Sequence, residues 1–312
     1  MKKIKLSFII IFALAISQTL AALSFNTGAD FLKLAGGPRI IALGETAAAA
    51  QLDASSFFHN PAGLTYCENE ITFVHSPAPQ GDASFDYLGG IYSARALGIF
   101  ALSVTSYRIT PIPVLDESGN DFGQLVWDDW AFSVAYANEL AKGLSLGVNG
   151  KYVYRYESNQ IFGTTIGKAL AADFGMVFEV PGIRGFRLGA AGENYGTTVK
   201  YSNDSHIDVL PSSVRLGAAY RLAERRDSSF DLAADLVKEK FGTFRPRMSA
   251  EYNYMDWLSL RGGYVNKEGN IAGINFGFGV VWQGFSFDMA SAVNGVFDRS
   301  VYMSVSKKFF SM

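Results

Sequence analysis

The sequence predicts an all-β protein, a transmembrane antiparallel β-barrel of about 14 strands with a short N-terminal hatch segment. Three observations predict this class. The chain starts with an export signal, apolar and polar residues alternate in many short runs, and long and short connectors alternate between those runs. We expect a signal peptide over residues 1–21, the hatch segment over 22–66 and the barrel over 67–312.

The first 21 residues have the order of regions of a secretory signal peptide. A basic stretch, Met1–Lys5, precedes an apolar run from Leu6 to Ile16, and a small-x-small cleavage site ends at Ala21. The run is shorter than the ~20 apolar residues of a spanning helix, and no cysteine follows it to carry a lipid anchor. Together with the strand pattern, this signal predicts the cell outer membrane as the destination.

The composition fits a barrel that meets lipid. The chain holds 32 Gly, 25 Phe and 15 Tyr, and only 18% of its residues are charged. With 27 Lys and Arg against 29 Asp and Glu, the charges nearly balance. A nucleic-acid surface needs clustered positive charge, so we expect no nucleic-acid partner. The expected partner is outer-membrane lipid.

The segment before the first strand lacks alternation. Small residues with some helical character run from Ile40 to Ala50. A short motif follows just before the first strand, where the chain must turn from hatch to wall. Pro61 fixes its own φ and biases Asn60 towards an extended backbone, and an Asn side chain can bond nearby backbone groups. We therefore expect a structural anchor made of Asn60, Pro61, Ala62, Gly63 and Leu64.

Apolar residues of the same segment predict contacts inside the barrel. Leu52, Phe57 and Phe58 could pack the hatch against the wall, or could line a small pocket for an apolar ligand. We favour hatch packing.

The barrel strands are predicted by period-2 alternation. From Gly143 to Glu157, one face carries Leu144, Leu146, Val148 and three tyrosines, and the other face carries small and polar residues. Aromatic residues gathered at one strand end are typical of the girdle where a barrel crosses the membrane interface. Similar runs predict further strands near 70–76, 84–94, 96–107, 129–139, 168–180, 186–191, 213–222, 230–236, 244–255, 257–266, 274–282, 284–293 and 299–310.

Connector lengths favour a membrane barrel over a soluble sandwich. We expect long loops at Ser76–Ala83, Arg108–Trp127, Ser158–Ile166 and Gly196–Leu210, and short turns at Leu140–Lys142 and Pro181–Arg184. Outer-membrane barrels place short turns at the periplasmic end and longer loops outside.

The face opposite the lipid is polar. Charged residues on it can pair across neighbouring strands and form a salt-bridged lumen wall. A charged constriction that selects ions is the alternative. The residues are Arg187, Arg215, Arg221, Asp231, Asp235, Arg245, Arg247, Glu251, Arg261 and Asp288.

The motifs of the N-terminal segment resemble the start of FadL-like outer-membrane proteins, especially the PorV/PorQ branch. The match is carried by Gly36, Gly37, Arg39, Leu43, Gly44, Asp53, Ala54, Ser55 and Asn60–Leu64. Leu258–Tyr264 and Phe285–Asp288 look similar to the family's C-terminal half. Two departures stand out: Glu45 lies where the family often has Gly, and the chain ends Phe309-Phe310-Ser311-Met312 rather than on an aromatic.

The resemblance implies a fourteen-stranded barrel with a hatch, and two classes of function. One is a role in type IX-like protein secretion or surface attachment of cargo, with secretion-system proteins or secreted cargo as partners. The other is FadL-like transport of hydrophobic small molecules such as long-chain fatty acids or aromatics. We favour secretion, because the chain is compact and its inward face is polar, whereas a greasy ligand needs an apolar pocket.

Enzymatic and metal-binding motifs are weak. We find no Gly-x-Ser-x-Gly elbow, phosphate loop or zinc signature, so we expect no enzyme and no cofactor. His59, His75 and His206 lack ligand spacing, and Asp116–Asp121 resembles a calcium loop with a misplaced Gly and no closing Glu. Cys67, the only cysteine, is expected to be a small residue at the first strand.

Overall fold

The computed structural model describes residues 27–34, 36–50, 53–55, 57–77, 83–94, 97–115, 121–159, 163–202, 207–267, 272–293 and 299–309. The expected signal peptide, Leu52, His206 and most of the expected calcium loop lie outside these residues.

Three short helices precede the strands: η1 (Asp30–Lys33), α2 (Pro38–Ala42) and η2 (Pro61–Tyr66). None of the described helices is long and apolar enough to cross a membrane. The strands are β1 (Asn69–Pro77), β2 (Ala83–Ser93), β3 (Ile99–Leu115), β4 (Asp121–Ala141), β5 (Leu144–Asn159), β6 (Gly163–Glu179), β7 (Phe186–Gly196), β8 (Val199–Tyr201), β9 (Ile207–Asp208), β10 (Ser213–Arg225), β11 (Ser228–Glu239), β12 (Arg245–Tyr254), β13 (Leu258–Asn266), β14 (Ala272–Trp282), β15 (Phe285–Val293) and β16 (Arg299–Phe309).

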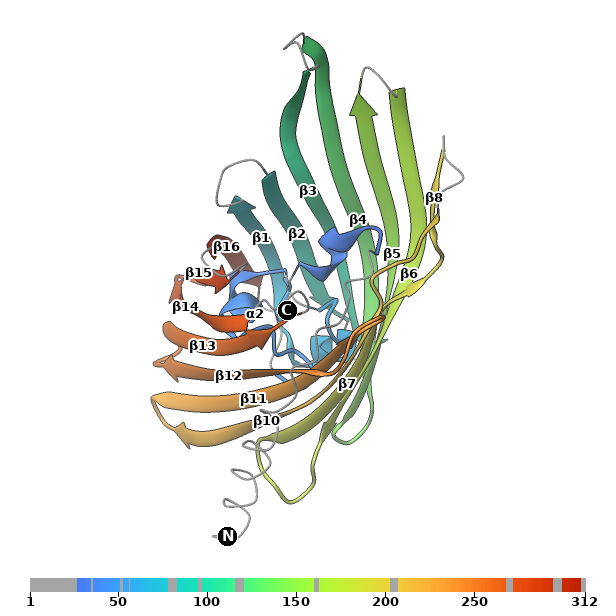
Figure 1. Ribbon diagram of the computed structural model, residues 1–312. Coiled ribbons are helices and arrows are strands. Elements are labelled where there is room, and N and C mark those ends of the chain that lie inside the picture. Colours follow the sequence, from blue (N-terminus) through green and yellow to red (C-terminus); the bar gives the residue numbers. More distant parts are fainter. Residues whose placement is uncertain are drawn as a thin grey trace.

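Fourteen of these strands form a closed antiparallel barrel, which confirms the predicted fold class. Each wall strand pairs with its neighbour in sequence, except that β10 pairs directly with β7 and β1 closes the ring against β16. The short strands β8 and β9 are added to the upper end of β6 and stand outside the ring. Figure 1 shows the ring of strands with the N-terminal segment inside it.

The two ends of the barrel differ as the sequence predicts. One end, called here the turn end, carries the tight connectors 142–143, 226–227 and 283–284. The other, the loop end, carries the 16-residue connector 197–212 that includes β8 and β9. Short turns mark the periplasmic end of outer-membrane barrels, so in an outer membrane the loop end would face the cell exterior.

Two predicted loops are largely strand. Ser158–Ile166 was expected to be long, but β5 and β6 stay paired up to Asn159 and Gly163. Arg108–Trp127 was expected to be a long connector, but β3 and β4 stay paired up to Leu115 and Asp121. Pro111 and Pro113 suggest a loop in the sequence, yet they fit here because β2 pairs with β3 only as far as Ile109. Beyond that point β3 is an edge strand with register shifts, the setting in which a sheet tolerates proline. As a result β3–β6 rise above the rest of the wall (Figure 1).

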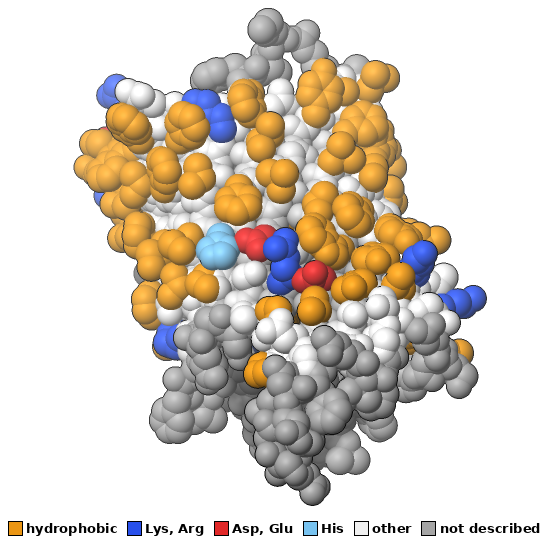
Figure 2. All heavy atoms as spheres, turned by 90° about the horizontal axis from the view of Figure 1, so that it is seen from above, with side chains coloured by type: hydrophobic (Ala, Val, Ile, Leu, Met, Phe, Trp, Pro, Cys, Tyr) orange, Lys and Arg blue, Asp and Glu red, His pale blue; other side chains and the backbone are white. Residues whose placement is uncertain are grey.

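Hydrophobic side chains cover the outer face of the barrel. On β5, Leu146 is 38% exposed and points outward, whereas Asn149 is 1% exposed and points into the barrel. Figure 2 shows one outer face on which hydrophobic side chains dominate and charged side chains form a narrow row. An outward apolar surface of this extent is what lipid solvates. Its most exposed members include Leu88, Leu102, Val134, Leu170 and Ile274.

Candidate functional site

The N-terminal segment, defined as residues 27–67, fills the interior of the barrel. The predicted anchor motif lies where this segment meets β5 and β6. The side-chain amide of Asn60 donates to the carbonyl of Ala48 at 2.5 Å and to that of Met176 at 3.2 Å, and its oxygen accepts from the Ala62 N–H at 3.1 Å. Asn60 thus caps η2 and joins it both to the segment and to the wall. Pro61, Ala62, Gly63 and Leu64 are all buried.

Two inward glycines let the motif lie against the wall. A Cβ on Gly175 would lie 2.0 Å from the Asn60 side-chain oxygen, and a Cβ on Gly147 would lie 2.4 Å from the Ala62 nitrogen. Only glycine allows the backbones to approach this closely. The sequence showed these glycines on the inward face of their strands, but alternation alone did not reveal what they face.

The other predicted hatch contacts are only partly visible. Phe57 and Phe58 are buried in an apolar cluster with Leu64 and Tyr87, and their two rings meet edge to face with centroids 6.2 Å apart. The Tyr87 hydroxyl donates to the Ala54 carbonyl. Phe57 and Phe58 thus lie between the N-terminal segment and the wall. Leu52 lies outside the described residues.

The interior wall has an apolar side and a charged side. Inward residues of β1–β4, β15 and β16 form the apolar cluster with the N-terminal segment: Val74, Phe85, Tyr87, Ile91, Ala101, Ala135, Ala137, Ala290, Ala292 and Tyr302. The charged residues expected in the lumen lie on β7 and β10–β15. The interior is therefore polar over much of the wall but not uniformly so, because β1–β4, β15 and β16 also present an apolar cluster to the N-terminal segment.

On the charged side, the wall ions face ions of the N-terminal segment. Arg39 of α2 binds Glu251 on β12 at 2.8 Å, and Glu251 also binds Arg261 at 2.8 Å. Arg261 in turn contacts Asp288 on β15. The four charges sum to zero, so this row is balanced only with α2 in place.

A second group of charges surrounds Arg215, one of the largest fully buried side chains. Arg215 binds Glu193 at 2.9 Å and Asp235 at 3.1 Å, and it donates to the carbonyl of Glu45. The same Asp235 oxygen accepts the backbone N–H groups of Ala47 and Ala48 at 2.7 and 3.0 Å. Charge-assisted hydrogen bonds from three donors stabilise the buried Asp235 carboxylate, and they fix the backbone of the N-terminal segment at Ala47 and Ala48.

Glu45 is the segment's own contribution to the charged side. Its carboxylate binds Arg247 at 2.6 Å and contacts Lys267. Burial alone would raise the pKa of Glu45, but the positive charges of Lys267 and Arg247 lower it to about 2. Glu45 is therefore ionised at any physiological pH.

His59 lies at the edge of the same group. Its Nδ1 is 3.1 Å from Glu193 and 3.5 Å from an Arg215 nitrogen. Burial lowers the pKa of His59, an effect that outweighs the nearby Glu193 carboxylate. The imidazole is therefore neutral at pH 7. His75 pairs instead with Asp86 on the outer face at 2.7 Å, so these two histidines do not share a site.

A second apolar cluster, called here the chamber because Phe31 and Leu32 fill it, lies nearer the loop end. Phe31 and Leu32 of η1 are buried there against Ala131, Val153 and Ala169. Further members of its lining are Ala171, Val199 and Leu210.

Ion pairs flank this chamber. Lys151 binds Asp173 at 2.7 Å, and Arg155 binds Asp129 at 2.9 Å. On β5 the inward order is Lys151, Val153, Arg155, so the apolar lining lies between the two pairs. The sequence did not single out this chamber, because its wall is built from small residues on three strands and its cover from a segment that lacks alternation.

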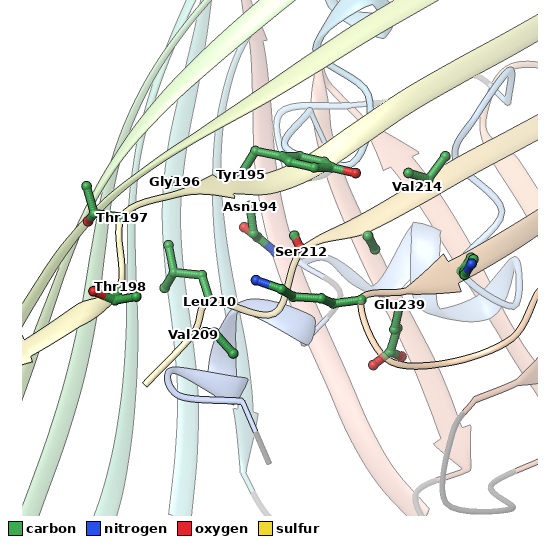
Figure 3. A pocket seen from close by; sticks show the side chains of 13 residues that line it. Asn194, Tyr195, Gly196, Thr197, Thr198, Val209, Leu210, Ser212, Val214 and Glu239 are labelled. Atoms are coloured by element: carbon green, nitrogen blue, oxygen red, sulfur yellow. The ribbon is translucent and has the colours of Figure 1, made fainter. Parts of the chain in front are cut away.

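A cavity of about 390 Å³ opens in the wall beside the chamber. Asn194 adopts φ 58°, and β7 pairs with β10 only up to Glu193, opposite Ser213. Above that point the two strands diverge, and Thr197, Thr198, Val209 and Leu210 line part of the space between them. Figure 3 shows the cavity between the end of β7, Val209, Leu210 and the first residues of β10.

The described residues offer no metal centre. Among them, no group of three or more His, Cys, Asp or Glu side chains is placed to hold a metal ion. The Cys67 thiol lies 3.5 Å from the Gly63 carbonyl, and burial raises its pKa, which disfavours the reactive thiolate. Cys67 precedes β1 by two residues, close to its expected place.

Comparison with known proteins finds relatives only among solved structures: no family model and no curated protein matches this chain. The toluene transporter TbuX of Ralstonia pickettii is 14% identical with a TM-score of 0.60, and the match covers 89% of this chain and 99% of TbuX. The toluene transporter TodX of Pseudomonas putida is 11% identical with a TM-score of 0.58, covering 88% and 96%. A FadL homologue of Pseudomonas aeruginosa is 10% identical with a TM-score of 0.50, covering 93% and 100%. At such identities the likeness concerns the fold, and this chain has a FadL-like barrel fold.

Proposed function

We propose that this protein is an outer-membrane transporter of hydrophobic small molecules, such as aromatic hydrocarbons or long-chain fatty acids. The observation that carries the proposal is the apolar chamber on β4–β6, with Phe31 and Leu32 seated in it. A site that holds one aromatic and one aliphatic side chain has the chemistry to hold an apolar ligand in their place. The similarity in fold to two toluene transporters supports the same function.

The PorV/PorQ-like role in secretion, favoured from the sequence, has less support. It rested on the polarity of the inward face. The charges on that face are largely engaged with the N-terminal segment and with one another, as Arg39 with Glu251 and Glu45 with Arg247. The number of polar residues on the inner wall therefore does not tell how polar the surface is that a small ligand would contact. The comparisons likewise favour the transporter.

The test measures uptake of a labelled hydrocarbon or fatty acid by a deletion strain that expresses the native protein or a variant from a plasmid. Ala131→Trp puts an indole into the chamber, whereas Phe132→Trp changes the next residue, which faces lipid and is 44% exposed. We expect Ala131→Trp to abolish protein-dependent uptake of labelled toluene or oleate and Phe132→Trp to leave it unchanged. Both variants are first checked for equal amounts of folded barrel in the membrane.

The same cells decide between the two classes of function. In the deletion strain, a transporter leaves the set of surface and secreted proteins unchanged while uptake falls. Depleted surface proteins together with normal uptake of both probes would reject transport and restore the secretion hypothesis.

A further inference from the structure

Four exposed lysines lie at the loop end of the wall. Lys238 and Lys240, at the end of β11, line the 390 Å³ cavity. Lys200 on β8 follows the cavity residue Thr198 by two positions, and Lys168 lies on the neighbouring strand β6. None of the four forms an ion pair with any carboxylate of the described residues. Lys168 and Lys200 even lie opposite each other in the β6–β8 pairing. Like charges placed opposite each other on one sheet face destabilise it, and a bound anion would relieve that repulsion.

Other cationic residues of the described part of this end have partners. On β1 and β2, His75 pairs with Asp86 at 2.7 Å. On β3 and β4, Arg108 lies 3.8 Å from Asp128. Arg245 and Arg299 donate to the neutral side chains of Asn266 and Ser291. The four lysines on β6, β8 and β11 are distinguished by the cavity beside them and by the lysine pair on β6 and β8.

The lysines stand at the border of the hydrophobic surface. On β11, Leu236 is 44% exposed and Lys238 follows two residues later on the same outward face. Aromatic rings lie beneath the ammonium groups, with Lys238 5.9 Å from the Phe244 centroid and Lys240 5.7 Å from that of Phe241. Lysines and aromatics next to apolar side chains are typical of the level of lipid headgroups.

The cavity beside Lys238 and Lys240 offers hydroxyl groups as well as positive charge. Lys238 and Lys240 line it, together with the hydroxyl-bearing Thr198, Ser212 and Ser213. Glu239 also lines it, and its carboxylate is 3.4 Å from Lys33 of the N-terminal segment, which it shares with Asp30 at 3.1 Å. Figure 3 shows Ser212, Thr198 and Glu239 around the opening. Ammonium groups and hydroxyls together suit a phosphate and the sugar that carries it.

We propose that this side of the barrel binds a phosphorylated glycolipid of the outer leaflet. Lys238 and Lys240 contact a headgroup phosphate at the cavity, Lys168 and Lys200 contact negative charge on the other side of it, and the acyl chains lie along the apolar surface below. The inference depends on the orientation of the barrel in the membrane and not on what the barrel transports.

The test measures lipid binding to the full-length protein in mild detergent by native mass spectrometry. The probes are lipid A with two phosphates, lipid A with one phosphate, and phosphatidylethanolamine. The variant is Lys238→Gln/Lys240→Gln, and the matched control is Lys142→Gln/Lys308→Gln, which removes two exposed lysines at the turn end. Circular dichroism and heat-modified mobility on gels confirm that each variant is folded.

We expect the two-phosphate lipid to bind best. The Lys238→Gln/Lys240→Gln variant should bind it roughly 30-fold more weakly, because each lysine is expected to contribute about a five- to sixfold effect. The control pair and the charge-preserving Lys238→Arg/Lys240→Arg variant should bind as the native protein does. Binding should also weaken as salt is raised.

Three outcomes would overturn the proposal: equal binding of all three lipids, equal loss in the turn-end control, or no loss in the Lys238→Gln/Lys240→Gln variant. A further arm adds inorganic phosphate alone. Displacement of the lipid by low millimolar phosphate would identify free phosphate, not a lipid, as the ligand of this cavity and would reject a lipid site.

Discussion

The carboxylate of Glu45 lies 2.6 Å from the guanidinium of Arg247, although 202 residues separate them in the chain. Glu45 has φ 60°, a left-handed backbone conformation that favours glycine. Glycine, which the resemblance noted in the sequence puts at this position, would adopt the same conformation without strain. Non-glycine residues in this conformation are strained by about 1–2 kcal/mol, which the buried ion pairs must exceed.

Replacing Glu45 by glycine should therefore destabilise the protein even though it relieves backbone strain. The gain from the relaxed backbone is about 1 kcal/mol, whereas removing one member of a buried ion pair costs about 3–5 kcal/mol. Urea titration of the folded protein measures the difference. Glu45→Gln keeps the strain and loses the charge, so it should be the less stable of the two. A Glu45→Gly protein more stable than the native one would show that Arg247 and Lys267 do not need the carboxylate.

Acid should loosen the N-terminal segment through His59. The charged groups around it balance, three positive and three negative, as long as His59 is neutral: Arg215, Arg247, Lys267, Glu45, Glu193 and Asp235. Because burial makes the pKa of His59 lower in the folded state than its ordinary 6.5, the unfolded state takes up the proton first. Stability should then decline as the pH falls below about 6.5, by at most about 1.4 kcal/mol per pH unit.

Limited proteolysis between pH 7.5 and 5 measures this release, with cleavage mapped to residues 27–67. His59→Gln removes this titration, so its cleavage rate should change less over that range than that of the native protein. Glu45 does not contribute there, because its pKa of about 2 limits its effect to pH values below about 4.5. A native protein with no pH dependence, or a His59→Gln protein with the same dependence, would contradict the prediction.

Asn60→Ala should weaken the anchor without changing the strands. It leaves the Ala48 and Met176 carbonyls without their donor, and an unsatisfied buried polar group costs about 1–3 kcal/mol. The strand signal in circular dichroism should remain while residues 27–67 become sensitive to protease. Thr65→Ala, in the same helix but only half-buried, should have the smaller effect. Equal protease sensitivity in the native and Asn60→Ala proteins would show that the side chain of Asn60 does not anchor the N-terminal segment.

Introducing a charged residue on the outer face should lower the free energy of refolding in lipid only where that residue lies within the hydrophobic surface. Leu102 is 62% exposed in mid-wall on β3, and Leu97 is 72% exposed in the connector before it. Leu102→Arg should lower the refolding free energy in lipid vesicles by about 2–4 kcal/mol and Leu97→Arg by about 0–1 kcal/mol. The reverse order would place the membrane differently on the barrel.

The strands were largely predictable because their signal is local. Each predicted run corresponds to one of the fourteen barrel strands, since alternation is set by neighbours in sequence. The upper halves of β3 and β4 were missed because Pro111 and Pro113 are compatible with a strand only at a sheet edge, and the edge is a property of the assembled sheet. Strands β8 and β9 were missed because three and two residues carry no pattern.

The site was predictable in its parts but not in its assembly. The position of Asn60–Leu64 between hatch and wall could be inferred from proline and asparagine chemistry. The pairing of Arg39 with Glu251 could not, because 212 residues lie between them. For the same reason the sequence showed a charged lumen face but not that the N-terminal segment neutralises much of it, and this led to the preference for secretion.

The seam between β1 and β16 imposes an order on biogenesis. Residues 69–75 pair with residues 303–309, so the ring cannot close before the last strand has crossed the inner membrane. The N-terminal segment emerges first, yet its ionic partners Asp235, Arg247 and Glu251 arrive near the end of translocation. Contacts so distant in sequence form slowly. The segment must therefore be kept from aggregating until the C-terminal half of the chain has been delivered. When β1 then pairs with β16, the closing barrel encloses the segment.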